Sequence, residues 1–379
     1  MKRFAFSGSA RRSSLYSAIV LFVVSAIVIG SSYAKDQLPF ELALTFPTKG
    51  SVTALAWAPD GKNLATVSDS GQSLTIWRAD GTRLRELPGV NVYVSPSLSF
   101  LGSGNLLLSP RQVDALSEKP LTLTLWNTAT GAAVHHIDGP GSPAEYVVSP
   151  DGKMVAARWF NMPILVYDTR DWTIMRVIHP PSVWTVAPPP NIVAENFPAN
   201  ITSLAFSPDS KLLAMGTTGR VLLTDLTQPD AVPISLFLFS DAFNNKDETT
   251  KFASISALAF SPDGKMLAAG ITVSIDRRGG ALNLVKIVRL EDQGLVVAYN
   301  DPPEYVGQMS WSADGAHLAV ATGAEAHVYT PLTPALRPFV LKFGSGSVPG
   351  SVPSLSFSPD GSRLAIAHRD EVKIFRTVQ

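Results

Sequence analysis

The segment "ALAFSPDGKMLAAG" at Ala257–Gly270 repeats, almost residue for residue, the segment "SLAFSPDSKLLAMG" at Ser203–Gly216. With the aspartate of "SPDG" as a reference, seven copies of this pattern follow one another at spacings of 43, 48, 58, 54, 51 and 46 residues. The reference positions are Asp60, Ser103, Asp151, Asp209, Asp263, Asp314 and Asp360. Repetition at such a period is the sequence signature of a repeat architecture.

Each copy predicts a strand, a turn and a returning strand. Large apolar residues lie five and three positions before the reference, as Leu258 and Phe260 do, and residues two apart share one face of a strand. The Pro-Asp-Gly sequence favours a tight turn, because proline presets φ, aspartate bonds nearby backbone and glycine accepts positive φ. A Leu-Ala step, as at Leu267, then offers one bulky and one small side chain on the returning strand.

Further strands complete a sheet in each copy. A third strand such as "SLTIW" (Ser73–Trp77) is present in every copy, and a fourth such as "TRLREL" (Thr82–Leu87) is evident in four of the first six. This repetition predicts an all-β fold, a seven-bladed β-propeller with four-stranded antiparallel blades. The last copy ends after "EVKIF" (Glu371–Phe375), and "FELALTF" (Phe40–Phe46) precedes the first. We therefore expect the N-terminal strand to pair with the C-terminal blade and close the ring.

With these residues in view, the chain resembles the WD40 repeat family, and more loosely the TolB-like propellers, whose repeats share the "FSPDG" turn. Trp77 and Trp126 stand where the family's tryptophan closes the third strand, and Tyr167-Asp168 resembles its Trp-Asp pair. The family's Gly-His dipeptide is missing from every copy, so its Asp-His-Ser-Trp hydrogen-bond set is not carried over. The resemblance implies an interaction platform rather than a catalyst.

The first 34 residues have the pattern of a secretory signal. Four basic side chains lie within residues 1–12, an uncharged apolar run covers Leu15–Gly30, and "SSYA" follows. We expect cleavage after Ala34 and a periplasmic or secreted propeller over residues 37–379. The alternative is an uncleaved segment that anchors the protein to a membrane. The formal net charge of the whole chain is zero, which gives no electrostatic signature of nucleic-acid binding.

The sequence carries no motif of catalytic chemistry. The chain has no cysteine, which excludes disulfides and thiolate metal sites, and it has no nucleophile elbow, His-Glu-x-x-His or phosphate-binding glycine loop. Its six histidines are spread over different predicted strands and loops, so we expect no metal, no cofactor and no catalytic residue. The alternative is an enzyme or small-ligand binder with a site at the axial mouth, where the inner strands offer mainly Ser, Thr and Glu145.

Insertions between the repeats predict where a partner binds. If the strands of a blade are labelled a to d, the long connections are b–c and d–a, which emerge on one rim of the ring. The candidate partner-binding residues on this rim are Arg111, Arg158, Trp159, Phe160, Trp184, Arg220, Arg277, Arg278, His368 and Arg369. For Trp159 and Phe160 the alternative is a structural plug between blades, and for Arg277 and Arg278 a solvated loop tip. The sequence thus predicts a non-catalytic scaffold for an unidentified protein or peptide.

Overall fold

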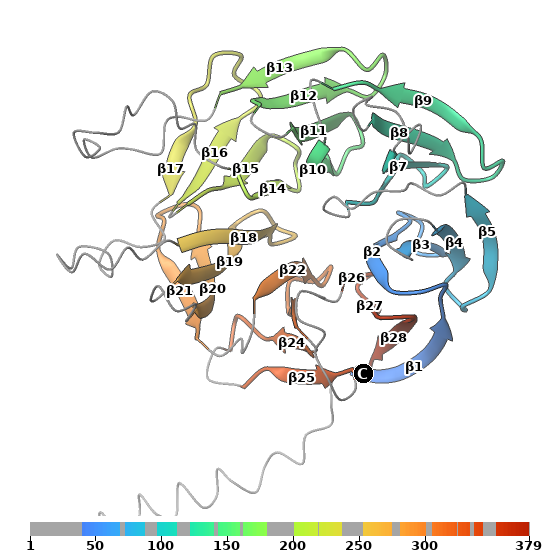
Figure 1. Cartoon of the computed structure of the whole chain (residues 1–379). Coiled ribbons are helices and arrows are strands. Elements are labelled where there is room, and N and C mark those ends of the chain that lie inside the picture. The colour runs from blue at the N-terminus through green and yellow to red at the C-terminus, as the bar shows by residue number, and fades with distance from the viewer. Residues whose placement is uncertain are drawn as a thin grey trace, which may run out of the picture. The chain divides into compact units, whose positions relative to one another are not determined.

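Short antiparallel strands joined by tight turns build the computed structural model (Figure 1). The structure describes residues 40–68, 73–87, 97–111, 122–139, 143–159, 162–179, 201–218, 220–236, 253–274, 281–300, 305–323, 325–333, 337–343 and 354–378. Within these ranges every regular element is a strand, and the strands form seven four-stranded antiparallel sheets arranged in a ring. The predicted all-β, seven-bladed propeller is confirmed, and the compact unit of residues 42–377 contains all of its strands apart from Phe40 and Glu41.

The first four blades follow the chain in order from the axis outward. Blade 1 contains β2 (Val52–Trp57), β3 (Asn63–Ser68), β4 (Ser73–Arg78) and β5 (Arg83–Leu87). Blade 2 contains β6 (Ser99–Leu101), β7 (Leu106–Arg111), β8 (Thr122–Asn127) and β9 (Ala133–Ile137). Blade 3 contains β10 (Pro143–Val148), β11 (Met154–Trp159), β12 (Ile164–Asp168) and β13 (Ile174–Ile178). Blade 4 contains β14 (Ser203–Phe206), β15 (Leu212–Gly216), β16 (Val221–Asp225) and β17 (Ile234–Leu236).

One of the last three blades combines strands from the beginning and the end of the propeller sequence. Blade 5 contains β18 (Ala253–Phe260), β19 (Met266–Ser274), β20 (Ala281–Arg289) and β21 (Leu295–Tyr299). Blade 6 contains β22 (Val306–Trp311), β23 (Leu318–Thr322), β24 (Glu325–Tyr329) and β25 (Phe339–Lys342). Blade 7 contains β26 (Ser354–Phe357), β27 (Arg363–His368), β28 (Glu371–Thr377) and β1 (Phe40–Pro47), with β1 next to β28 at the outer edge.

The first strand of each blade lies nearest the axis. These inner strands contact one another in sequence from β2 through β26, and β26 contacts β2 again. Hydrogen bonds cross this last junction, because the Leu55 N–H donates to Ser354 Oγ at 2.9 Å and Trp57 Nε1–H donates to the Ser356 carbonyl at 3.0 Å. Blades 1 and 7 are therefore bonded directly at the axis.

Apolar side chains from facing sheets fill the space between blades. The cluster between blades 4 and 5 joins Val221 and Leu223 to Leu258, Phe260 and Leu267, all of them buried. These residues of blade 5 occupy the repeated apolar columns of the sequence. A fully buried side chain of this size contributes about 1.5–3 kcal/mol, so the same interblade packing, repeated around the ring, accounts for the repeated sequence.

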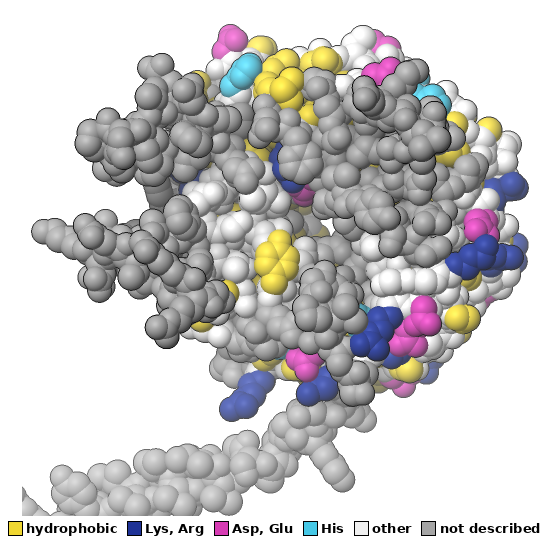
Figure 2. Space-filling model, viewed as in Figure 1, with side chains coloured by type: hydrophobic (Ala, Val, Ile, Leu, Met, Phe, Trp, Pro, Cys, Tyr) yellow, Lys and Arg dark blue, Asp and Glu magenta, His cyan; other side chains and the backbone are white. Residues whose placement is uncertain are grey.

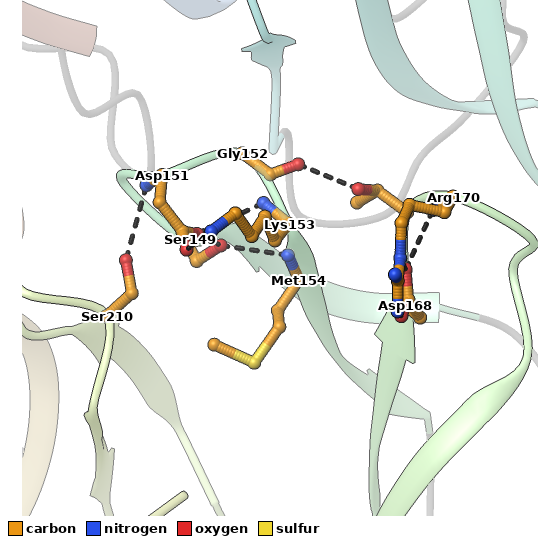
Figure 3. A network of polar contacts seen from close by, with 9 residues as sticks. Ser149, Asp151, Gly152, Lys153, Met154, Asp168, Arg170 and Ser210 are labelled. Carbon is orange, nitrogen blue, oxygen red and sulfur yellow. Dashed lines mark hydrogen bonds and ion pairs between the residues drawn. The ribbon is translucent and has the colours of Figure 1, made fainter. Parts of the chain in front are cut away.

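The Ser-Pro-Asp-Gly turns are held by a short hydrogen-bond network, shown for blade 3 in Figure 3. Ser149 Oγ donates to Asp151 Oδ1 at 2.7 Å, the Lys153 N–H donates to the same oxygen, and the Met154 N–H donates to Ser149 Oγ. The same serine-aspartate bond recurs in four other turns at 2.5–2.6 Å. In blade 5, for example, this bond lowers the pKa of Asp263. The aspartates of these turns therefore have a structural role.

Blade 4 departs from the pattern at the glycine position of the turn. Ser210 stands there with a φ of 61°, a conformation that favours glycine. Its hydroxyl accepts a hydrogen bond from the Asp151 N–H of blade 3 at 3.2 Å, as Figure 3 shows. The turn of blade 4 therefore carries backbone strain and a bond to the neighbouring blade at the same residue.

Candidate functional site

The strand connections divide the ring into two faces. Neighbouring strands are antiparallel, so the a–b and c–d turns lie at one end of a blade and the b–c and d–a connections at the other. We call the first the turn face and the second the loop face. The loop face is the side on which the sequence predicts the docking rim.

Blade 5 extends farther than its neighbours on the loop face. β18 has 8 residues and β19 and β20 have 9 each, whereas β14 of blade 4 has 4. An additional bridge joins Thr218 to Ser254, and the Ile255 carbonyl accepts a hydrogen bond from Ser203 Oγ at 2.9 Å. The loop-face ends of blades 4 and 5 are therefore bonded to each other.

The predicted site residues that the structure describes all lie at loop-face ends of strands. They are Arg111, Arg158, Trp159, Arg220, His368 and Arg369, while Phe160, Trp184, Arg277 and Arg278 lie outside the described residues. Arg111 ends β7 opposite Thr122, and Arg220 is half-buried just before β16. The six come from blades 2, 3, 4 and 7, so the structure does not gather them into one cluster.

Trp159 is buried, with 1% of its surface exposed. It packs with Tyr146, Val155 and Tyr167 in the cluster between blades 2 and 3. A Cβ on Gly139 would lie 2.0 Å from its ring, so this glycine provides the space that the indole occupies. The burial supports the alternative interpretation, in which Trp159 fills a blade junction and is not contacted by a partner.

His368 is also buried, at the end of β27, and its ring lies 5.8 Å from that of Phe343. Burial lowers the pKa of His368, and the neighbouring positive charge of Arg369 adds to this effect. Arg369 itself is exposed with a φ of 53°, and its carbonyl accepts a hydrogen bond from the Val52 N–H at 2.6 Å. Of these two candidates, Arg369 has the side chain that a partner can contact.

Polar side chains on the inner strands bond one blade to the next near the axis. Each of these residues stands six positions before the reference position of its own repeat. Its side chain accepts a hydrogen bond from a backbone N–H of the next blade, where the donor is the residue five positions before the reference. The donor-acceptor pairs are Tyr146–Ser97, Leu204–Glu145, Leu355–Gln308 and Leu55–Ser354. The site residues predicted from the sequence do not include this column, although its polar residues recur at one fixed offset.

Glu145 and Arg158 form a charged pair at the loop-face end of the junction between blades 3 and 4. They are opposite each other on β10 and β11, with 3.7 Å between Arg158 Nε and Glu145 Oε2. Their side chains are 19% and 16% exposed, and neither of these two atoms has a hydrogen-bond partner among the described residues. Burial raises the pKa of Glu145 to about 7, although the positive charge of Arg158 and the Leu204 N–H act in the opposite direction.

The fold itself does not require this charged pair. At the position of Arg158 the other six copies carry Val67, Pro110, Gly216, Gly270, Ala321 and Ala367. At two of them the next blade approaches closely, since a Cβ on Gly270 would lie 2.4 Å from Val306 and a Cβ on Gly216 would lie 2.8 Å from Ile255. Blade 3 carries an arginine at this position, where blades 4 and 5 carry glycine.

Tyr305 lies at the loop-face end of the inner strand of blade 6. Its side chain is 48% exposed. Burial of the hydroxyl raises the pKa of Tyr305, a hydrogen bond with Ser256 opposes the rise, and the negative charge of Glu145 adds to it. Inner-strand ends of blades 3, 5 and 6 therefore bring a carboxylate and two hydroxyl groups within electrostatic range of one another.

A family model for "WD domain, G-beta repeat" matches residues 40–78, 193–225 and 248–278, which contain strands of blades 1, 4, 5 and 7. Together with the ring of seven four-stranded blades, these matches decide the family. The chain belongs to the WD40-repeat propellers. WD40 propellers are typically scaffolds for protein interactions. A comparison with curated proteins gave no match.

Within the described ranges, no group of three or more His, Asp or Glu residues is arranged to hold a metal ion. The same part of the chain contains no helix long and apolar enough to cross a membrane. In the described part of the chain, Glu145, Ser256 and Tyr305, which lie on or next to inner strands, and Arg158 of β11 form a set of ionisable and hydroxyl groups.

Proposed function

We propose that this WD40 propeller is a non-catalytic scaffold that docks a protein or peptide partner on its loop face. The observation that carries the proposal is the exposure of three large apolar side chains on that face. Met162, Leu282 and Tyr305 are 41%, 42% and 48% exposed, and each lies at or next to a strand end. Aromatic residues and methionine are enriched at interfaces, and an exposed leucine beside them adds apolar area that a partner can bury.

The first prediction tests the loop face against another apolar surface. Hydrophobic side chains also gather over the outer edge of blade 3, where β13 exposes Ile174, Met175 and Val177 (Figure 2). We expect a triple variant of Met162, Leu282 and Tyr305 to serine to lose a partner that the native chain retains in affinity capture with mass spectrometry. A matched triple serine variant of the β13 residues should retain it.

Circular dichroism and the unfolding midpoint of both triple variants should match those of the native chain, because the substituted side chains are exposed. Loss of the partner from the β13 variant with retention by the loop-face variant would move the docking surface to the outer edge. Turnover of a small molecule by the purified chain would reject the scaffold assignment itself.

We also propose that the protein is exported, on the basis of the basic, apolar and small-residue pattern of residues 1–34. When the full chain is expressed with a C-terminal tag in a Gram-negative host, we expect a periplasmic protein whose intact mass corresponds to a first residue of Lys35. Recovery in the membrane fraction with Met1 retained would support the anchored alternative. A full-length chain in the cytoplasm would contradict export.

A further inference from the structure

The Glu145–Arg158 pair is a specialisation of blade 3. In the same cross-strand position, the described registers of the other blades place Ala54 opposite Val67, Ser203 opposite Gly216, Ala257 opposite Gly270, Gln308 opposite Ala321, and Ser354 opposite Ala367. These pairs are small, neutral or apolar. Repeats within one chain face the same packing problem, so they act as internal controls for what the fold needs.

Gln308 shows that the interblade bond does not need a charge. Gln308 Oε1 accepts hydrogen bonds from Ser354 Oγ at 2.9 Å and from the Leu355 N–H at 3.0 Å. Glu145 Oε1 accepts the equivalent bond from the Leu204 N–H at 3.2 Å. The neutral side chain fulfils the structural role, so the negative charge of Glu145 and the arginine opposite serve another purpose.

The guanidinium of Arg158 has more donors than the pair uses. Arginine carries five N–H donors, and among the described residues its charged partner is Glu145, at 3.7 Å from Nε, which is too long for a direct hydrogen bond. Glu145 is the weaker partner near neutral pH, because burial raises its pKa to about 7 while an arginine stays charged. The pair therefore carries a net positive charge whenever Glu145 is protonated.

The surroundings suit a negatively charged group. The titratable groups that act on Glu145 in the described part of the chain are Arg158 and Tyr305, and Ser256 adds a hydroxyl. Near the middle of the ring, Figure 2 shows a basic and an acidic side chain beside each other. Planar, bidentate recognition of a carboxylate is the chemistry for which a guanidinium is best shaped.

We infer that Arg158 binds a carboxylate of the docked partner at the loop-face end of the junction between blades 3 and 4, and that Glu145 takes up a proton when this carboxylate displaces it. The inference rests on the proposed function, since the carboxylate belongs to a peptide on the same face. The partner is then an extended peptide that presents its C-terminal carboxylate or an acidic side chain at the axis.

The experiment uses small probes and the side-chain Nε–H signal of Arg158 in the chain labelled with ¹⁵N-arginine. N-acetylglycine represents a chain terminus, N-acetylaspartate amide represents an acidic side chain, and N-acetylasparagine amide is the neutral control. We expect a saturable shift with one or both carboxylates and none with the control. Arg158→Gln, which identifies the signal by its loss, should weaken binding by about tenfold or more, as followed by the amide signals of β14 in the uniformly ¹⁵N-labelled chain.

Proton uptake gives a second readout. If binding requires protonated Glu145, a pKa of about 7 makes the probe bind about tenfold more tightly at pH 6 than at pH 8. In Glu145→Gln, which keeps the acceptor for Leu204 as Gln308 does for Leu355, binding at pH 8 should equal binding at pH 6. If Glu145 had only a structural role, its replacement by glutamine would leave the pH dependence of binding unchanged.

The inference is overturned if no probe shifts the signal, if the neutral control shifts it equally, or if methylammonium binds in place of the carboxylates. The proposed function is tested separately. A partner that is lost from the loop-face triple variant but retained by Arg158→Gln leaves the docking face in place and removes only the carboxylate site.

Discussion

Replacement of Trp159 by alanine should lower the free energy of unfolding by about 3–5 kcal/mol, the cost of truncating a fully buried large aromatic side chain. The indole is 1% exposed, packs with Tyr146 and Tyr167, and lies against Gly139, where a Cβ would come within 2.0 Å of the ring. Urea unfolding followed by tryptophan fluorescence and circular dichroism measures the change.

Met162 provides the matched control. It is three residues farther along the chain and 41% exposed, so its replacement by alanine should change the free energy of unfolding by less than about 0.5 kcal/mol. If the Trp159 variant unfolds at the native midpoint, the indole is not a packing residue and its role as a docking contact returns. Partner capture by the Trp159 variant alone reports on folding as well as on binding.

The sequence predicts the fold well because every blade meets the same packing requirement. Residues such as Leu258, Phe260 and Leu267 recur at fixed offsets, and the structure buries each of them. The fourth strands of blades 2 and 4, β9 and β17, are weaker in the sequence. Outer strands face solvent on one side, so they need no apolar pattern that repeats from blade to blade, and β17 has only 3 residues.

The orientation of the residues at strand ends could not be predicted in the same way. A register shift between Pro143 and Glu145 lies opposite the end of β11, and it changes which side chains there face the next blade. Side chains alternate between the two faces at a strand end, and the sequence alone does not fix the register, so it left Trp159 either buried or exposed. Glu145 and Arg158 are 13 positions apart, and only the register of β10 on β11 places them opposite each other.

The candidate site was predicted in part. The loop face was predicted from the positions of the insertions, and Arg158 was among its candidate residues. The inner-strand column was missed, because its members Ser97, Glu145, Gln308 and Ser354 differ in size and charge and share only the ability to accept a hydrogen bond. A search for polar residues at a fixed offset between copies would have found them.

Replacement of Glu145 by glutamine should stabilise the propeller increasingly as the pH rises from 5 to 8. The pKa of Glu145 is raised from the ordinary 4.5 to about 7 by burial, so the folded state disfavours the ionised carboxylate. The protonated carboxyl of Glu145 makes its full contribution to the free energy of unfolding below pH 4.5. This contribution is lost as the pH rises through 7. The difference between the two pKa values corresponds to a loss on the order of 3 kcal/mol when the group is fully ionised.

Unfolding in urea at pH 5, 6, 7 and 8 measures this difference, and the comparison of variant with native chain cancels the titration of all other groups. The gain of the glutamine variant should be small at pH 5 and approach its full value at pH 8. Gln308→Glu is the converse control at the equivalent position of blade 6, where Ala321 stands in place of an arginine. As the pH rises, Gln308→Glu should destabilise the chain. The effect should exceed the destabilisation that ionised Glu145 causes in the native chain, because no positive charge lies opposite position 308. A pH-independent difference for Glu145→Gln would show that Arg158 fully compensates the carboxylate, and the junction would then hold an ordinary ion pair.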